Sequence, residues 1–241
     1  LEGAAATGSQ AGAGAHPAPK ALIAPHAGYI YSGPIAASAY TRLKAHADSI
    51  SRVVLLGPAH RLPIRGLAAS SAQAFLTPLG PVPLDRGGIA GALELPQVQL
   101  LDQAHEGEHS LEVHLPFLQV VLGEFSLIPL VVGEASAEEV AEVLEVLWGG
   151  PETLVVVSSD LSHYQSYAEA NELDGQTARA IEEFRPQEIG YEQACGRIPV
   201  GGLLIRAQEK GLSVERVDLR NSGDTAGPWD RVVGYGSWVL G

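Results

Sequence analysis

Short apolar runs that end in glycine or proline alternate along this chain with segments of helical periodicity. The runs at 21–24, 53–56 and 154–157 are continuous stretches of Val, Leu, Ile and Ala. Such runs are typical of strands that are buried on both faces of a sheet, as in parallel sheets covered by helices. The pattern therefore predicts an α/β fold, with one domain and a mainly parallel central sheet flanked by helices.

The segments between and after these runs predict five main helices. Ser136 is placed to cap one of them, and Pro34 is expected as the first helical residue of another, after a loop over 28–33. Pro116 should kink the helix that begins at Ser110. The predicted helices span 34–43, 110–122, 137–148, 168–184 and 199–210. Further strands are expected at 127–132, 214–219 and 232–240, the last two antiparallel at one edge, with a hairpin around Gly80.

The first nineteen residues have a different composition from the rest of the chain. They are mainly Ala, Gly, Ser, Gln and Pro with little apolar bulk, which is typical of a flexible arm. We therefore expect an arm over 1–19 and an α/β domain over 20–241. The chain begins with Leu1 rather than methionine, so further residues are expected upstream.

Composition and charge argue against several kinds of partner. The 241 residues carry a formal net charge of −13 without a run of Lys or Arg, which argues against nucleic acid and anionic membrane surfaces. No apolar stretch approaches the roughly 20 residues of a membrane helix, and no signal-peptide pattern opens the chain. The single cysteine excludes an internal disulfide. A cytoplasmic protein is the expectation.

Side chains that bind metals follow the first two buried runs. His26 and His60 come soon after runs about one βαβ unit apart, so the two strands are expected to be neighbours, with both imidazoles at the sheet edge where ligands bind. Cys195 precedes a predicted helix, whose amides, with Arg197, should favour the thiolate. Two imidazoles and a thiolate suit iron, copper or zinc. The alternatives are histidines hydrogen-bonded in loops and a buried, inert thiol.

Asp160 and His163 follow the run at 154–157 in the segment SSDLSH. The carboxylate is expected to orient the imidazole, so that the pair acts as a general base or supplies a further metal ligand. The alternative is a helix start that Ser159 or Asp160 caps, with His163 in solvent.

The segment HEGEH at 105–109 formally matches the H-E-x-x-H motif of zinc proteases. That motif needs a helix to bring both histidines to one face, and Gly107 disfavours a helix here. The protease interpretation is therefore rejected. His109, Glu112 and His114 are instead expected either to wall the crevice or to lie on a solvated helix face.

Six blocks in order resemble the Memo family, whose prokaryotic members are called AmmeMemoRadiSam system protein B. They are PHAGYIYSG, LGPAH, EHSLEVHLPF, SSDLSHY, CGRIP and RNSGDT. The resemblance implies a fold similar to LigB-type class III extradiol dioxygenases, which use nonhaem Fe(II). It places the family's metal ligands on His26, His60 and Cys195, and a cleft histidine on His163 beside Asp160. A thiolate replaces the carboxylate ligand of the dioxygenases, and the family's usual Arg- and Pro-containing opening is missing before Lys20.

Three functional hypotheses follow. The first is a metal-dependent redox protein that holds Fe(II), or copper, on His26, His60 and Cys195, while His163 and Asp160 handle protons. The second keeps the same ligands but binds zinc and activates water for hydrolysis. The third is a vestigial site in a protein that binds partners or phosphopeptides, since the resemblance implies association with AMMECR1-like and radical SAM proteins.

Overall fold

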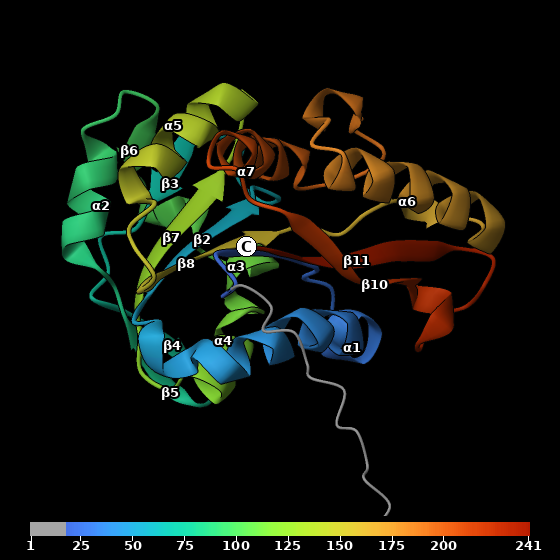
Figure 1. The fold of residues 1–241 in the computed structure, drawn as a ribbon, viewed down its shortest axis with the longest axis horizontal. Helices are drawn as coiled ribbons and strands as arrows, with labels where there is room; N and C mark the ends of the chain where they lie inside the picture. Colours follow the sequence, from blue (N-terminus) through green and yellow to red (C-terminus); the bar gives the residue numbers. More distant parts are fainter. Residues whose placement is uncertain (1–17) are drawn as a thin grey trace, which may run out of the picture.

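A nine-stranded mixed sheet forms the centre of the protein in this computed structural model, which describes residues 18–241. The four middle strands run parallel in the order β1-β8-β2-β7, and the strands outside them are mostly antiparallel. The predicted α/β class with helices around a central sheet is confirmed (Figure 1). The strands are β1 (Ala21–Ala24), β2 (Arg52–Pro58), β3 (Leu67–Ala69), β6 (Val98–Leu100), β7 (Ser126–Val132), β8 (Thr153–Ser158), β9 (His163–Gln165), β10 (Val214–Asn221) and β11 (Val232–Leu240).

Helices cover both faces of this sheet. Figure 1 shows α5 (Ala137–Leu147), α6 (Tyr167–Glu182) and α7 (Arg197–Glu209) on one side. On the other side lie α1 (Tyr29–Tyr40) and α4 (Leu115–Leu122). The remaining elements are α2 (Arg86–Leu93), α3 (His109–Glu112), the hairpin of β4 (Ala74–Thr77) and β5 (Gly80–Pro83), and the 3-10 segments η1 (Thr41–Ser49), η2 (Asp102–Ala104), η3 (Pro186–Glu188) and η4 (Ser222–Asp224).

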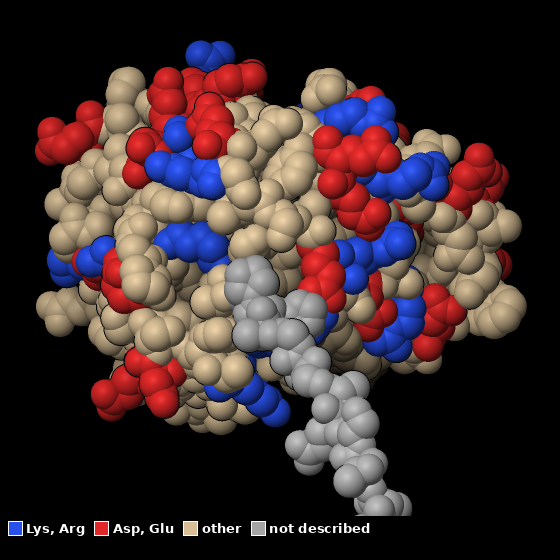
Figure 2. Space-filling view, in the orientation of Figure 1, with Lys and Arg blue, Asp and Glu red and all other residues tan. Residues whose placement is uncertain are grey.

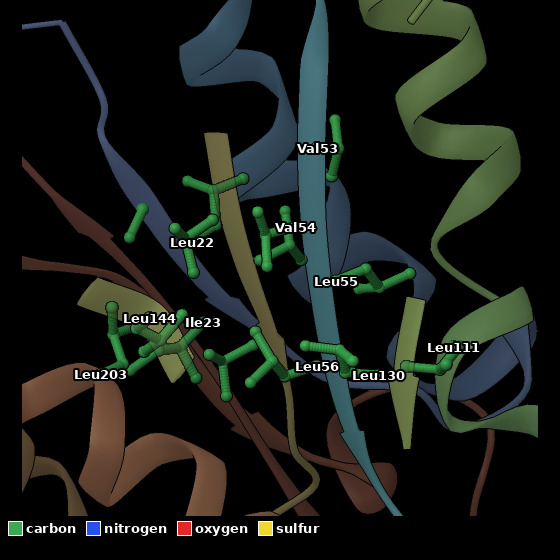
Figure 3. Packing of buried hydrophobic residues seen from close by; sticks show 14 of the residues in the cluster. Leu22, Ile23, Val53, Val54, Leu55, Leu56, Leu111, Leu130, Leu144 and Leu203 are labelled. Carbon is green, nitrogen blue, oxygen red and sulfur yellow. The ribbon is translucent and has the colours of Figure 1, made fainter. Parts of the chain in front are cut away.

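The core lies between the middle strands and the helices. Every residue from Val53 to Leu56 is fully buried, and so is every residue of β1. Because successive side chains of a strand point to opposite faces, this continuous burial means that both faces are covered. Figure 3 shows these strand side chains together with Leu144 of α5 and Leu203 of α7 in one apolar cluster. The sheet is therefore a rigid support for the loops at its ends.

The order of the middle strands corrects one expectation. β1 and β2 are not neighbours, because β8 pairs with both of them and lies between. The spacing of β1 and β2 in the sequence indicates parallel strands in one sheet, but it carries no information about a strand that enters between them about a hundred residues later. Their histidines nevertheless meet, as described below.

Helix α1 also begins earlier than expected. The Gly28 carbonyl accepts hydrogen bonds from the backbone N–H groups of Tyr31 (2.8 Å) and Ser32 (3.1 Å), so the helix starts at Tyr29 and contains Pro34. The proline removes one internal hydrogen bond. Burial of Ile35 and Ala36 against the sheet compensates for that loss.

The helix expected over 110–122 is divided into α3 and α4. The division falls at Val113 and His114, directly before Pro116 at the start of α4, so the predicted kink is a break. The other predicted helices and strands lie where the pattern placed them, with shifts of a few residues at their ends. Ser136 caps α5 as expected. Most of the arm expected over 1–19 lies outside the described residues.

The surface carries its acidic excess in a dispersed form. On the face shown in Figure 2, acidic and basic side chains alternate rather than forming one large patch. Within residues 18–241, no helix is long and apolar enough to cross a membrane.

Asp174 of α6 supports the loop between β8 and β9. Its carboxylate accepts a hydrogen bond from the Ser162 backbone N–H at 2.9 Å, next to His163, and the residue is 2 % exposed. Burial raises the pKa of Asp174 to about 6, although the hydrogen bonds from Ser162 act in the opposite direction. The folded state therefore binds this proton more tightly than the unfolded chain, and stability is lost as the pH rises through about 6.

We predict that Asp174→Asn removes this dependence, because the amide stays neutral and its oxygen can still accept from Ser162. Between about pH 4.5 and 8, the free energy of unfolding of wild type should fall by about 2 kcal/mol relative to the variant. Urea unfolding of both proteins at the two pH values measures this difference. If the difference in free energy of unfolding between the two proteins does not change with pH, Asp174 is not the group that titrates near pH 6.

Candidate metal site

The carboxyl ends of β1, β8 and β2 form one edge of the sheet, and the candidate site is built there. These strands are parallel neighbours with Ala24 opposite Ser158 and Leu56 opposite Val157. The side chains two residues beyond each strand therefore project from the same edge. They are His26, Asp160 and His60.

His26 is the most enclosed of these residues, with 1 % exposure. Its backbone N–H donates to the Asp160 carboxylate at 2.8 Å, which fixes the loop. Its ring has Nδ1 2.6 Å from the Ser158 hydroxyl and directs Nε2 toward Cys195 and Asp160. Burial lowers the pKa of His26 to about 4, although the Asp160 charge opposes the shift. The imidazole is thus neutral at pH 7, the form that binds metals.

His60 is held by a carboxylate that the sequence did not single out. Glu108 is buried and accepts from the His60 backbone N–H at 2.6 Å, and its other oxygen lies 3.0 Å from His60 Nδ1. Burial raises the pKa of Glu108, but the hydrogen bonds from His60 and from the Ser110 amide outweigh it and lower that pKa to about 2. The pairing at Nδ1 leaves Nε2 of His60 free to bind a ligand, the arrangement common for metal-binding histidines.

His109 joins the first two histidines. Its ring centroid is 5.0 Å from that of His60 and 5.5 Å from that of His26, and the His26 and His60 centroids are 5.2 Å apart. Each of the three offers a nitrogen, and these nitrogens lie within 4.8 Å of one another, close enough to share one ion. His109 was expected either to wall the crevice or to lie on a solvated helix face, and not as a ligand.

Gly57 explains why His109 approaches so closely. A Cβ at Gly57 would lie 2.8 Å from both Leu111 Cδ2 and Ser110 Oγ, so only glycine lets the start of α3 pack on the end of β2. The H-E-x-x-H match has no part in this: residues 105–108 form no helix and Gly107 has a φ of +66°. His105 packs instead against Phe75, with the ring centroids 5.6 Å apart.

Cys195 lies at the same edge, before α7. Its Sγ is 3.6 Å from His26 Nε2 and accepts a hydrogen bond from the Asp160 backbone N–H at 3.3 Å. A Cβ at Gly196 would lie 2.5 Å from the Ser158 carbonyl oxygen, so this glycine allows the turn to approach β8. Cys195 is not part of the mutually close set that the three histidines form within the described chain.

The charge state of Cys195 differs from the expectation. Burial, reinforced by the Asp160 charge, raises the pKa of the thiol to about 12. The expected activation by Arg197 and the helix amides is therefore wrong for the metal-free protein, since desolvation outweighs it. A cation at the site would reverse this balance, because a bound metal stabilises the thiolate directly.

Asp160 and His163 do not form the expected pair. The Asp160 carboxylate bonds to the backbone N–H groups of His26 and Ala27, and no hydrogen bond joins it to His163 among the described residues. His163 lies in β9, which pairs with β11, and its neighbour Tyr164 has a φ of +61°. Asp160 thus orders the His26 loop, while His163 lines the cavity beside the site.

A cavity of about 650 Å³ opens over these residues. His60, Cys195 and His163 line it together, and Tyr164, Tyr191 and Arg197 lie around it. His114 does not wall this cavity, because it is fully buried beneath the site. The cavity has the size of a small-molecule site, and its lining includes imidazole and thiol side chains of the types that can ligate metals.

Comparisons with known proteins agree with the blocks noted in the sequence. Residues 5–239 match the family described as Memo-like protein. A MEMO1 family protein of Aquifex aeolicus is 35 % identical over 231 residues, covering 90 % of this chain and 84 % of that protein. One from Aeropyrum pernix is 37 % identical over 247 residues, covering 94 % of this chain and 85 % of that protein.

A solved structure shares the fold. The uncharacterized protein JW3007 of Escherichia coli K12 superposes with a TM-score of 0.57 over 92 % of this chain and 99 % of that one, at 13 % sequence identity. This likeness supports the architecture alone. The family match over nearly the whole length, with relatives at 35 % and 37 % identity, establishes that this chain belongs to the Memo-like protein family.

Proposed function

We propose that this protein binds one divalent transition metal ion at the sheet edge and uses it in redox chemistry on a small molecule in the cavity above. The observation that carries the proposal is the convergence of His26, His60 and His109, with the Cys195 thiol 3.6 Å from His26 Nε2. Fe(II) is the first candidate, and copper or zinc are the alternatives.

The donor set fits such an ion. Two ligand atoms on one tetrahedral ion, with a metal–sulfur bond near 2.3 Å and a metal–nitrogen bond near 2.0 Å, lie about 3.5 Å apart. The separation of Cys195 Sγ from His26 Nε2 is close to that value. Imidazole and thiolate are ligands for iron, copper and zinc rather than for magnesium or calcium. His26, His60 and Cys195 are the proposed ligands, with His109 as a fourth donor.

A metal at this position would act as a Lewis acid or an electron carrier toward a molecule in the cavity. The protein's own groups have separate tasks. Glu108 orients His60, Asp160 holds the His26 loop, and His163 faces the cavity as the group that can accept or donate a proton. Apolar residues such as Pro63 and Ile64 also line the cavity.

Two rivals keep the same residues. Zinc in place of a redox metal would make the site hydrolytic. A site without metal would leave the cavity as a binding surface for a phosphopeptide or for AMMECR1-like and radical SAM partners. Metal content of protein purified without oxygen separates redox metal from zinc, and stoichiometric metal of either kind argues against the third view.

The assignment of Cys195 as a ligand can be tested by its effect on metal affinity. Because its thiol is protonated in the metal-free protein and a ligand must be a thiolate, binding should release a proton. Release of this one proton should make the affinity for Co(II) rise about tenfold for each pH unit. Cys195→Ser should remove that dependence and the sulfur-to-metal charge-transfer band, and should weaken binding at least tenfold, about 1.4 kcal/mol.

Spectroscopic titrations of both proteins under reducing conditions, over a range of pH, measure these effects. Because serine nearly preserves the side-chain volume, thermal unfolding of the variant serves as a control for its fold. Equal affinities and identical spectra would exclude Cys195 from the site.

A further prediction concerns His163. His163→Ala should leave metal stoichiometry nearly unchanged, because the proposed ligands remain, while it weakens turnover or small-molecule binding in the cavity. His60→Ala should lower the stoichiometry itself. Replacement of His46, in η1, by alanine is the matched control and should change neither property. Loss of the metal from the His163 variant would show that this residue is a ligand.

A further inference from the structure

A chain of buried hydrogen bonds runs from His26 away from the cavity into the core. His26 Nδ1 lies 2.6 Å from Ser158 Oγ, the same hydroxyl lies 2.8 Å from His114 Nε2, and His114 Nδ1 lies 2.7 Å from the Tyr40 hydroxyl. All four residues are at most 1 % exposed. The chain joins the turn after β1, strand β8, helix α1 and the break between α3 and α4.

Burial of such a chain reduces the stability of the fold unless every polar atom has a hydrogen-bond partner. Apolar side chains could fill the same volume under the sheet edge without that cost. The end of the chain nearest the cavity is His26 Nε2, which lies 3.6 Å from Sγ of the cavity-lining residue Cys195. Because of this connection, the hydrogen-bond chain can determine whether His26 Nε2 carries a hydrogen.

Counting donors and acceptors fixes the direction of the chain. Among the described residues, His114 is the only hydrogen-bond partner of the Tyr40 hydroxyl, so the phenol satisfies its hydrogen only by donating it to His114 Nδ1. A neutral His114 then carries its own hydrogen on Nε2 and donates it to Ser158 Oγ. Ser158 in turn donates to His26 Nδ1.

The result is a His26 ring with its hydrogen on Nε2. Both rings are neutral in this arrangement, because they are at most 1 % exposed and burial disfavours the charged imidazolium. A metal ion at Nε2 needs the opposite tautomer, with hydrogen on Nδ1 and the lone pair on Nε2.

We propose that Tyr40 polarises this chain so that the metal-free protein holds His26 in the Nε2–H tautomer, and that a metal bound at Nε2 reverses all three hydrogen bonds. This rests on the proposed metal site. In the reversed chain His26 Nδ1–H donates to Ser158, Ser158 donates to His114 Nε2, and His114 Nδ1–H donates to Tyr40. Tyr40 is then left with a buried hydroxyl hydrogen that has no acceptor.

The proton count balances over the reversal. Tyr40 passes its proton to His114 Nδ1, His114 passes the proton on Nε2 to Ser158, and Ser158 passes its proton to His26 Nδ1. The proton on His26 Nε2 leaves to solvent, and Tyr40 regains one from water during local opening. Each group ends with the number of protons with which it began. Tyr40 and His114 are thus positioning residues that oppose metal binding.

The test is the tautomer of each histidine, read from ¹⁵N chemical shifts and long-range ¹H–¹⁵N couplings in protein with and without Zn(II). Wild type without zinc should show both His26 and His114 protonated on Nε2. With zinc, His114, which touches no proposed ligand directly, should switch to Nδ1–H. A His114 ring that keeps its tautomer, or a metal-free His26 protonated on Nδ1, would overturn the proposal.

Two variants sharpen this test. Ser158→Ala should disconnect the chain, so that zinc no longer switches His114, whereas Ser237→Ala is the matched control. Ser237 is also fully buried, and its hydroxyl has no hydrogen-bond partner within the described residues. Its replacement should leave the switch intact. A switch that persists in Ser158→Ala would show that the two rings are not coupled through Ser158.

Tyr40→Phe should bind zinc about tenfold more tightly than wild type, because it removes the hydroxyl that metal binding leaves unsatisfied. Weaker binding by this variant, with an unchanged thermal unfolding midpoint, would contradict the proposal. A wild-type protein that takes up no zinc would refute the proposed metal site and the reversal. The tautomers of the metal-free protein would still decide whether Tyr40 polarises the chain.

Discussion

The structure depends on the parallel pairing of β1, β8 and β2. Because these strands run in one direction and end at one edge, three turns separated widely in the sequence deliver His26, Asp160 and His60 to one place. Full burial of the strands on both faces makes the edge rigid. Glycines at 57 and 196 then allow α3 and the turn before α7 to pack on the strand ends, which adds His109 and Cys195.

Much of this arrangement could be predicted from the sequence. The apolar runs identify the buried strands, and each run is followed by a side chain of the site, so the convergence of His26 with His60 follows from the general rule for α/β sheets. The position of β8 between their strands could not be predicted, since strand order depends on connections that periodicity does not report. The start of α1 was misplaced because Pro34 is tolerated inside the helix.

The contributions of Glu108 and His109 depend on a turn that residue patterns do not predict. Both lie in the HEGEH segment, which was rejected because Gly107 prevents a helix, and that rejection was correct. The segment acts instead through a turn, with Glu108 capping α3 and bonding to His60. Similarly, Cys195 was expected to be acidic, but its burial and the nearby Asp160 raise its pKa. The sequence indicates which types of residue lie near a site. Their burial and their hydrogen-bond partners depend on tertiary contacts, and these set their pKa values.

The central claim is that imidazoles and one thiolate share a single ion. X-ray absorption of the zinc-loaded protein at the metal K-edge tests it most directly, because it counts scatterers by element and distance. We expect one sulfur at about 2.3 Å and two or three imidazole nitrogens at about 2.0–2.1 Å, with one zinc per chain. A first shell made only of nitrogen and oxygen, or zinc well below one per chain, would contradict the account.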